Sequence, residues 1–380
     1  MMQSNNIVEL ACAGSGKTWR MCHDSICCDN SSKKMLMISY THKGIYSIKK
    51  EYAQQNQGVL GKNIIIYTWF QFLLRELIKP YQRSFLGKIC QVRSCDFSQL
   101  YGIDYSHKNS KEYFLNCNYD VKANHASEFA VLLNKLSAGA VIKRLEETYS
   151  CIYIDELQDL VGYDIDLLEL LFLSSIKIYC VGDYKQATLK THNPKSNKTK
   201  GGMYVFKYLE TIKESHRLNI IKNNTSRRFI SDIAQFINLF YLEDPVISIV
   251  ECNEQAIGVF QITEDNAPKY IQFYSPTILK YDIKTSTLNY PSLNFGVSKG
   301  MTLDRVLIFP NGPLTDFLID PSKKLKAPDR YYVGVTRAKY SLTFVVKKLI
   351  ENKYFKKSKI CIGDDEIDVL KFNNSNHTNN

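Results

Sequence analysis

A glycine-rich turn near the start of the chain, at residues 11–18, constrains the fold more than any other feature of the sequence. It reads Ala-Cys-Ala-Gly-Ser-Gly-Lys-Thr, follows an apolar run at 7–10 and precedes a helix-like segment at 19–26. This order predicts strand, tight turn and helix, because glycine allows backbone angles that other residues resist. The backbone N–H groups of such a turn, with the positive end of the following helix, form an anion site. The sequence therefore predicts a phosphate-binding turn.

The turn also predicts its ligands, ATP and Mg²⁺. We expect Lys17 to reach the β- and γ-phosphates of ATP and the Thr18 hydroxyl to ligate Mg²⁺. Ala11 stands where the usual pattern has its first glycine. The other residues expected to surround the phosphates are Ala13, Gly14, Ser15 and Gly16.

Length and composition predict a globular protein with a polyanionic partner. The chain has 380 residues, enough for two or three domains, and 44% of them are hydrophobic. Its formal net charge of +11 suits nucleic acid. No apolar run reaches the ~18 residues that span a bilayer. The start of the chain lacks a signal-peptide pattern, and the 11 scattered cysteines match no metal motif, so we expect a cytoplasmic protein with free thiols and no membrane partner.

Apolar, β-branched runs alternate with longer segments of helical spacing, such as 129–147. This alternation predicts an α/β fold with parallel sheets covered on both faces. The first runs lie at 35–39, 64–67, 151–154 and 176–181. A second series begins near Val246, with runs at 259–262, 276–280, 306–309 and 342–346.

Two of these runs end in residues suited to ATP hydrolysis. The run at 151–154 leads into Asp155 and Glu156. We expect Asp155 to hold Mg²⁺ and Glu156 to deprotonate the attacking water. The run at 176–181 leads to Gln186, whose amide can donate to a phosphate oxygen and accept from that water.

Residues 79–124 interrupt the alternation and predict a small inserted subdomain, in which tyrosines are interleaved with Lys and Arg. Such a segment suits unpaired bases, because bases stack on aromatic rings while basic groups meet the phosphates. A tyrosine-rich packing surface with solvated charges is the alternative. A second interruption, at 190–200, predicts a basic loop.

Taken in order, these segments resemble the UvrD/Rep/PcrA group of superfamily 1 DNA helicases, over about residues 7–346. Motif I is the turn at 11–18, motif II is Asp-Glu-Leu-Gln-Asp at 155–159, and motif III is 182–186. Motif VI is Tyr-Val-Gly-Val-Thr-Arg-Ala-Lys at 332–339, and the resemblance implies that Arg337 is an arginine finger. Motif IV lies near 224–238, where Arg228 is the expected phosphate-binding arginine and Arg227 is the alternative.

The resemblance also implies contacts with single-stranded DNA. Motif Ia resembles Ser-Tyr-Thr-His-Lys at 39–43, motif Ib resembles Thr-Trp-Phe at 68–70, and motif V spans 297–304. The residues expected on the DNA side are Thr41, His42, Thr68, Trp69 and Lys299.

The family organisation implies two RecA-like lobes, at 1–215 and 216–360, with ATP between them. Residues 361–380 would form a tail with a disordered end. Three departures stand out: no adenine-reading glutamine segment precedes motif I, Thr302 replaces a ribose-binding glutamate, and the large second-lobe insertion is missing. Such short chains resemble helicase subunits that pair with a nuclease in anti-phage systems.

Two alternatives to a DNA translocase remain. A P-loop kinase for a small molecule would explain the turn at 11–18 but not the later motifs in their order. A DNA-binding ATPase that acts as a switch without unwinding would keep every motif.

Overall fold

A computed structural model describes residues 6–28, 32–88, 91–98, 106–188 and 200–373. Most of the predicted basic loop at 190–200 and the end of the predicted tail lie outside these residues. The chain divides into two units: Met1–Ala11 with Lys17–Asn223, and Cys12–Gly16 with Asn224–Asn380. The lobe boundaries expected from the sequence stay predictions.

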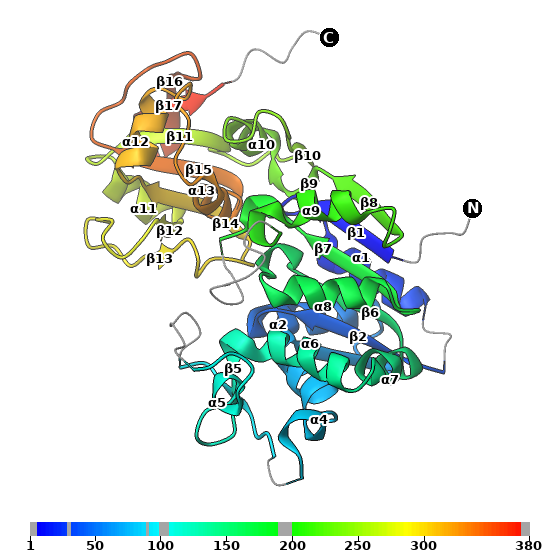
Figure 1. Ribbon diagram of the computed structural model, residues 1–380. Coiled ribbons are helices and arrows are strands. Elements are labelled where there is room, and N and C mark those ends of the chain that lie inside the picture. Colours follow the sequence, from blue (N-terminus) through cyan, green and yellow to red (C-terminus); the bar gives the residue numbers. More distant parts are fainter. Residues whose placement is uncertain (1–5, 29–31, 89–90, 99–105, 189–199, 374–380) are drawn as a thin grey trace. The chain divides into compact units, whose positions relative to one another are not determined.

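The first unit is built on a six-stranded sheet with the order β3-β2-β6-β7-β1-β8 (Figure 1). Every neighbouring pair of strands is parallel. The strands are β1 (Asn6–Ala11), β2 (Lys34–Ser39), β3 (Ile64–Thr68), β6 (Tyr149–Ile154), β7 (Lys177–Gly182) and β8 (Leu218–Asn223). This sheet confirms the predicted α/β fold class.

Helices cover both faces of this sheet, as the apolar strands require. Strand β2 shows the division, because Met35 and Met37 join one buried cluster while Leu36 and Ile38 join another. The helices are α1 (Lys17–Cys27), α2 (His42–Gln55), α3 (Trp69–Phe72), α6 (Ala126–Leu136), α7 (Ala140–Thr148), α8 (Tyr163–Phe172) and α9 (Val205–Ile212). The helical run expected at 129–147 is two helices, since the chain turns at Gly139, where φ is +84°.

The described part of the insertion at 79–124 contains short elements: α4 (Arg83–Leu86), β4 (Cys95–Asp96), α5 (Lys111–Phe114) and β5 (Val121–Lys122). Two of its tyrosines serve packing. Tyr113 is 4% exposed and donates to Glu128 Oε2 at 2.9 Å, and the Tyr81 hydroxyl donates to Ala140 O at 2.7 Å. For Tyr113 the packing alternative holds and base stacking is wrong, because its ring is buried, whereas Tyr81 is half-buried.

The second unit contains a seven-stranded sheet with the order β13-β12-β14-β15-β11-β17-β16. The parallel strands are β11 (Gly258–Thr263), β12 (Thr277–Lys280), β13 (Leu293–Asn294), β14 (Leu303–Phe309) and β15 (Ala338–Val346). A separate parallel pair joins β9 (Thr225–Ile230) to β10 (Ile247–Val250). The helices are α10 (Ser231–Asn238), α11 (Ala267–Tyr274), α12 (Gly312–Ile319) and α13 (Pro328–Val335).

The expectation of a tail from residue 361 is wrong for the part that the structure describes. Strands β16 (Phe355–Ile362) and β17 (Asp365–Phe372) form an antiparallel hairpin, and β17 pairs with β11. Phe355 and Phe372 are buried against Phe236 of α10. These aromatic contacts make the hairpin part of the core of the second unit.

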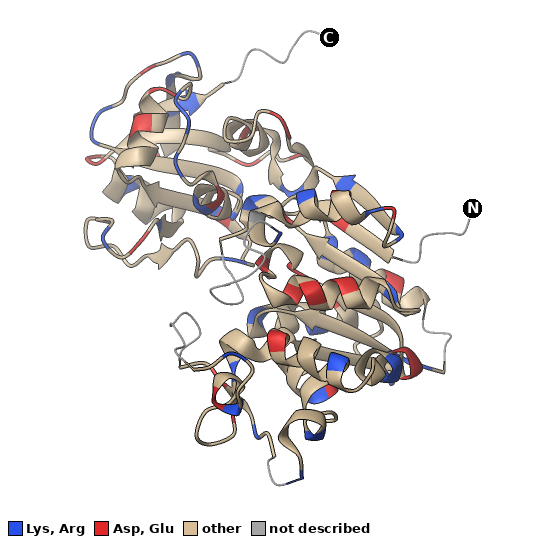
Figure 2. Ribbon diagram, in the orientation of Figure 1, with Lys and Arg blue, Asp and Glu red and all other residues tan. Residues whose placement is uncertain are grey.

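The charge of the chain is unevenly spread. Figure 2 shows several Asp and Glu residues along α8, which contains Asp164, Asp166 and Glu169, while residues of both signs occur on each unit. Among the described residues, no helix is long and apolar enough to cross a membrane.

Candidate functional site

The predicted site residues of the first unit follow strands that end at one edge of one sheet. All six strands are parallel, so their carboxyl ends share an edge, which is where ligands bind in open α/β sheets. Along this edge the segments run in the order β3, β2, β6, β7 and β1. The predicted DNA-side segments follow β3 and β2, and the predicted nucleotide-side segments follow β6, β7 and β1.

The turn between β1 and α1 has the backbone that a phosphate-binding turn needs. Gly14 and Gly16 have φ values of +77° and +86°, in the left-handed region that favours glycine. Helix α1 begins at Lys17, and the Lys17 Nζ donates to Ala11 O at 3.1 Å. The lysine side chain therefore lies back along the turn, and its contact with the phosphates stays a prediction.

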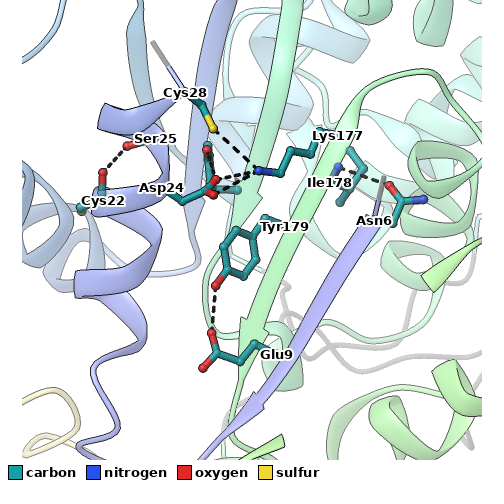
Figure 3. A network of polar contacts seen from close by, with 10 residues as sticks. Asn6, Glu9, Cys22, Asp24, Ser25, Cys28, Lys177, Ile178 and Tyr179 are labelled. Carbon is teal, nitrogen blue, oxygen red and sulfur yellow. Dashed lines mark hydrogen bonds and ion pairs between the residues drawn. The ribbon is translucent and has the colours of Figure 1, made fainter. Parts of the chain in front are cut away.

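A partly buried polar network joins β1, α1 and β7 (Figure 3). Glu9 of β1 is 3% exposed, pairs with Arg20 of α1 and accepts from the Tyr179 hydroxyl at 3.0 Å. Asp24 of α1 accepts from Lys177 Nζ at 2.9 Å. Burial and the neighbouring Glu9 carboxylate raise the pKa of Tyr179, so its hydroxyl remains a donor. These contacts hold α1 against β1 and β7.

The two predicted acids occupy a strained turn at the end of β6. The Asp155 N–H donates to Ile38 O of β2 at 2.8 Å, so the β2–β6 pairing continues to the first acid. Glu156 has φ +58° and ψ +45°, an uncommon conformation for a residue other than glycine. Its N–H donates to Asp155 Oδ1 at 2.9 Å. Such strain clusters at functional sites, where the surrounding structure holds it in place.

Gln158, which the sequence analysis did not single out, connects the acids to the segment after β7. Its Nε2 donates to Glu156 Oε2, and its Oε1 accepts from the Asp183 N–H at 2.9 Å. The Asp183 carboxylate then accepts from Gln186 Nε2 at 2.9 Å. Gln158 is fully buried. Its place in the Asp-Glu-Leu-Gln-Asp run was the signal that could have identified it.

We expect Gly182→Ala to break this connection. A Cβ at Gly182 would lie 2.6 Å from Gln158 Oε1 and 3.1 Å from Leu157 Cβ, so Gln158 must move. Displacement of a positioning group by about 1 Å can cost on the order of 10²-fold in rate. The measurement is steady-state ATP hydrolysis, beside nucleotide binding, which should change little. Gly312→Ala is the control, because nothing lies within 4 Å of a Cβ there. Equal rates for the two variants would contradict a role for Gln158.

The predicted DNA-side residues of the first unit lie in three different environments. Thr41 and Thr68 cap helices: Thr41 Oγ1 accepts from Gly44 N at 3.0 Å, and Thr68 forms a capping box with Gln71. His42 is exposed at the start of α2. The prediction for Trp69 is wrong, because it is 1% exposed and donates from Nε1 to Asp164 Oδ1 at 2.9 Å. A ring buried in this way cannot meet a base.

In the second unit, the two predicted arginines both contact Thr336. Arg228 is half-buried and donates from Nη1 to Thr336 O at 3.3 Å, whereas the neighbouring Arg227 is exposed. Arg337 is 1% exposed and donates from Nη2 to Thr336 Oγ1 at 2.9 Å and from Nε to Val333 O at 2.8 Å. The contact with Thr336 distinguishes Arg228 from Arg227, and the catalytic roles of both predicted arginines stay predictions.

Lys299, the predicted DNA-side residue of the second unit, is half-buried and directly precedes Gly300, where φ is +86°.

A family model described as the UvrD/REP helicase N-terminal domain matches residues 98–190. This segment contains the acids after β6 and the residues after β7, including Gln158 and Gln186. This chain resembles the UvrD-like helicases of superfamily 1. The match confirms the resemblance that the motif order indicated.

Comparison with solved structures gives further matches. A complex described as arterivirus nonstructural protein 10 (helicase) with DNA is 13% identical, with a TM-score of 0.45. The similarity covers 90% of this UvrD-like chain and 61% of the arterivirus chain. Comparison with curated protein sequences finds no significant match.

Proposed function

We propose that this UvrD-like chain hydrolyses ATP, with Mg²⁺, to move along single-stranded DNA. The observation that carries the proposal is the order of segments along one sheet edge. Strand β6, which presents Asp155 and Glu156, lies between β7 and β2. We expect nucleotide on the β7 side and DNA on the β2 side. Strand β2, which leads into α2, is the direct neighbour of β6. A movement of the acids during hydrolysis would therefore need to cross only one strand to reach the start of α2.

The residues after β1 and β6 suit a magnesium nucleotide. The Thr18 hydroxyl and the Asp155 carboxylate supply the oxygen ligands that Mg²⁺ prefers. When bound, Mg²⁺ would neutralise charge on the phosphates. Lys17 and the N–H groups of the turn would bind the phosphates, and Glu156 would accept the proton of the attacking water. Gln186 and the two predicted arginines would stabilise the charge of the transferring group.

Steady-state ATP hydrolysis with and without single-stranded DNA tests this proposal. A motor requires strong stimulation by DNA, whereas a small-molecule kinase requires none. Nucleotide binding can be followed separately by tryptophan fluorescence, because the chain has only two tryptophans. Trp19 is 48% exposed and directly follows Thr18, while Trp69 is buried. Binding without DNA-dependent hydrolysis would contradict the proposal.

We expect relaxed nucleotide selectivity. Thr302 stands where the resemblance implies a ribose-binding glutamate, while the expected phosphate contacts remain. GTP and dATP should support hydrolysis within about tenfold of ATP, a difference of ~1.4 kcal/mol. The measurement is kcat/KM for the three nucleotides at saturating DNA. A hundredfold preference for ATP over both would show that other residues read the nucleoside.

The resemblance to short helicase subunits supports two finer proposals. The partner would be a nuclease that supplies surface for duplex separation, and the context would be anti-phage defence. An unwinding assay on a tailed duplex tests the first, since the pure chain should hydrolyse ATP on the strand yet separate the duplex poorly. Robust unwinding by protein free of any partner would contradict it.

A further inference from the structure

Three aromatic side chains from separate segments gather beside the DNA-side strand ends of the first unit. Tyr40 follows β2, Phe70 lies in α3 after β3, and Phe97 follows β4 of the insertion. The Phe70 and Phe97 rings meet edge to face, with centroids 4.9 Å apart at 83°. The Tyr40 and Phe70 centroids are 6.1 Å apart. Neighbouring strands β2 and β3 bring the first two together, because Ser39 pairs with Thr68.

Phe97 is the exposed member of this aromatic cluster. It is 52% exposed, whereas Phe70 is 9% exposed and Tyr40 is half-buried. Phe70 packs into the hydrophobic core, so it supports the Phe97 ring but exposes little surface of its own. An aromatic ring that is half exposed and supported from one side leaves apolar surface for a flat ligand.

The backbone on both sides of Phe97 is held in place. Asp96, immediately before it, pairs with Lys122 of β5. The Asp96 carboxylate accepts from the Ser98 N–H at 2.9 Å and from Asn116 Nδ2 at 3.0 Å. The ring is therefore presented by a constrained segment, which reduces the conformational entropy lost when it binds a ligand.

Charge beside the cluster favours a ligand that carries phosphates. Tyr40 directly precedes Thr41, the N-cap of the 14-residue helix α2. The first turn of α2 has no acid, and it places His42 and Lys43, both exposed, at the positive end of the helix. A cation there opposes the helix dipole, which makes the local potential more positive. The negative phosphates of a nucleic-acid strand would offset this positive potential.

We propose that Phe97, supported by Phe70 and Tyr40, is a stacking platform for an unpaired base of single-stranded DNA. The inference rests on the proposed function, which supplies the DNA strand. It assigns to the insertion a base contact that the buried Tyr113 cannot make. Stacking is tolerant of sequence, because every base has a π face, so the platform suits a protein that moves along any strand.

The test is binding of a fluorescent oligothymidine, followed by anisotropy. Phe97→Ala should weaken binding about fivefold or more, the range expected for one lost stack. Phe97→Tyr should bind as the wild type does, because the ring remains. The slope of log affinity against log salt should stay unchanged, since that slope counts phosphate contacts. A folding defect would weaken binding to every strand, whereas a lost stack weakens binding only where a base is present.

Phe273→Ala is a closely matched control. Phe273 of α11, in the second unit, is 49% exposed and meets Tyr274 edge to face at 4.8 Å and 88°. It should bind the oligonucleotide as the wild type does. An abasic strand of the same length should bind equally to the wild type and to Phe97→Ala, because it offers no base.

The outcomes separate this inference from the proposed function. Wild-type affinity in Phe97→Ala, with DNA-stimulated hydrolysis intact in the wild type, overturns the stacking platform alone. An equal loss of affinity in Phe273→Ala, or a loss in Phe97→Ala on the abasic strand, also overturns it. If single-stranded DNA neither binds the wild type nor stimulates its hydrolysis, the proposed function fails first.

Discussion

Glu156→Gln should still bind ATP but lose nearly all DNA-stimulated hydrolysis. The amide has the shape of the carboxylate, and its oxygen can still accept from Gln158 Nε2, so the strained turn after β6 should persist. It cannot accept the proton of the attacking water. Loss of general-base catalysis typically costs on the order of 10²–10⁴-fold in rate. Hydrolysis and Trp19 fluorescence, measured on the same protein, separate catalysis from binding.

Lys17→Ala gives the contrasting result, and Glu147→Gln is the control. Lys17→Ala should weaken nucleotide binding as well as abolish turnover, because the lysine is expected on the phosphates. Glu147 is exposed in α7, away from the carboxyl edge, so its replacement should change neither measurement. Hydrolysis at the wild-type rate by Glu156→Gln would show that another group accepts the proton.

Arg337→Ala should lower hydrolysis by about 10³–10⁵-fold while ATP still binds, if the arginine stabilises the transferring phosphoryl group. The structure adds a second effect. Arg337 is buried, and its hydrogen bonds to Val333 O and Thr336 Oγ1 would be lost. Val333 O keeps the Thr336 hydroxyl as a donor, whereas Thr336 Oγ1 loses its donor. A buried acceptor without a donor destabilises a fold by ~1–3 kcal/mol, so thermal unfolding must be measured beside hydrolysis.

Arg337→Lys separates the loss of catalysis from the loss of stability. Arg227 and Arg228 of β9 test the expected register of motif IV. Lysine keeps the charge and most of the length but not the planar guanidinium, so it should fold better than alanine and remain slow. Arg228→Ala should slow hydrolysis more than Arg227→Ala, because Arg228 contacts Thr336 and Arg227 is exposed. Equal or reversed effects of the two β9 variants would show that motif IV is in the other register.

Much of the first unit follows from local patterns in the sequence. The turn at 11–18 could be predicted, because the angles at Gly14 and Gly16 are ones that few other residues adopt. The positions of Asp155 and Glu156 followed from an apolar run that ends in acids. Both predictions depend on residues close together in the chain.

The failures involve side chains whose environment comes from distant segments. Trp69 lies in a motif expected on the DNA side, yet Asp164, 95 residues later, accepts its N–H in the core. The polar composition of 79–124 did not show that Tyr113 is buried while Phe97 is exposed. No local pattern reports which face of a short element another segment covers.

The sequence by itself determined the glycine turn at 11–18, the alternation of strands and helices, and the order of the motifs, because these depend on backbone sterics and on side-chain periodicity along the chain. Only the tertiary structure decided that Gln158 links Glu156 to Asp183, that β16 and β17 complete the second sheet, and that Phe97 is the exposed ring beside Phe70. These depend on pairings between segments far apart in the chain. Burial and hydrogen bonding between such segments are settled only when the sheet order is known.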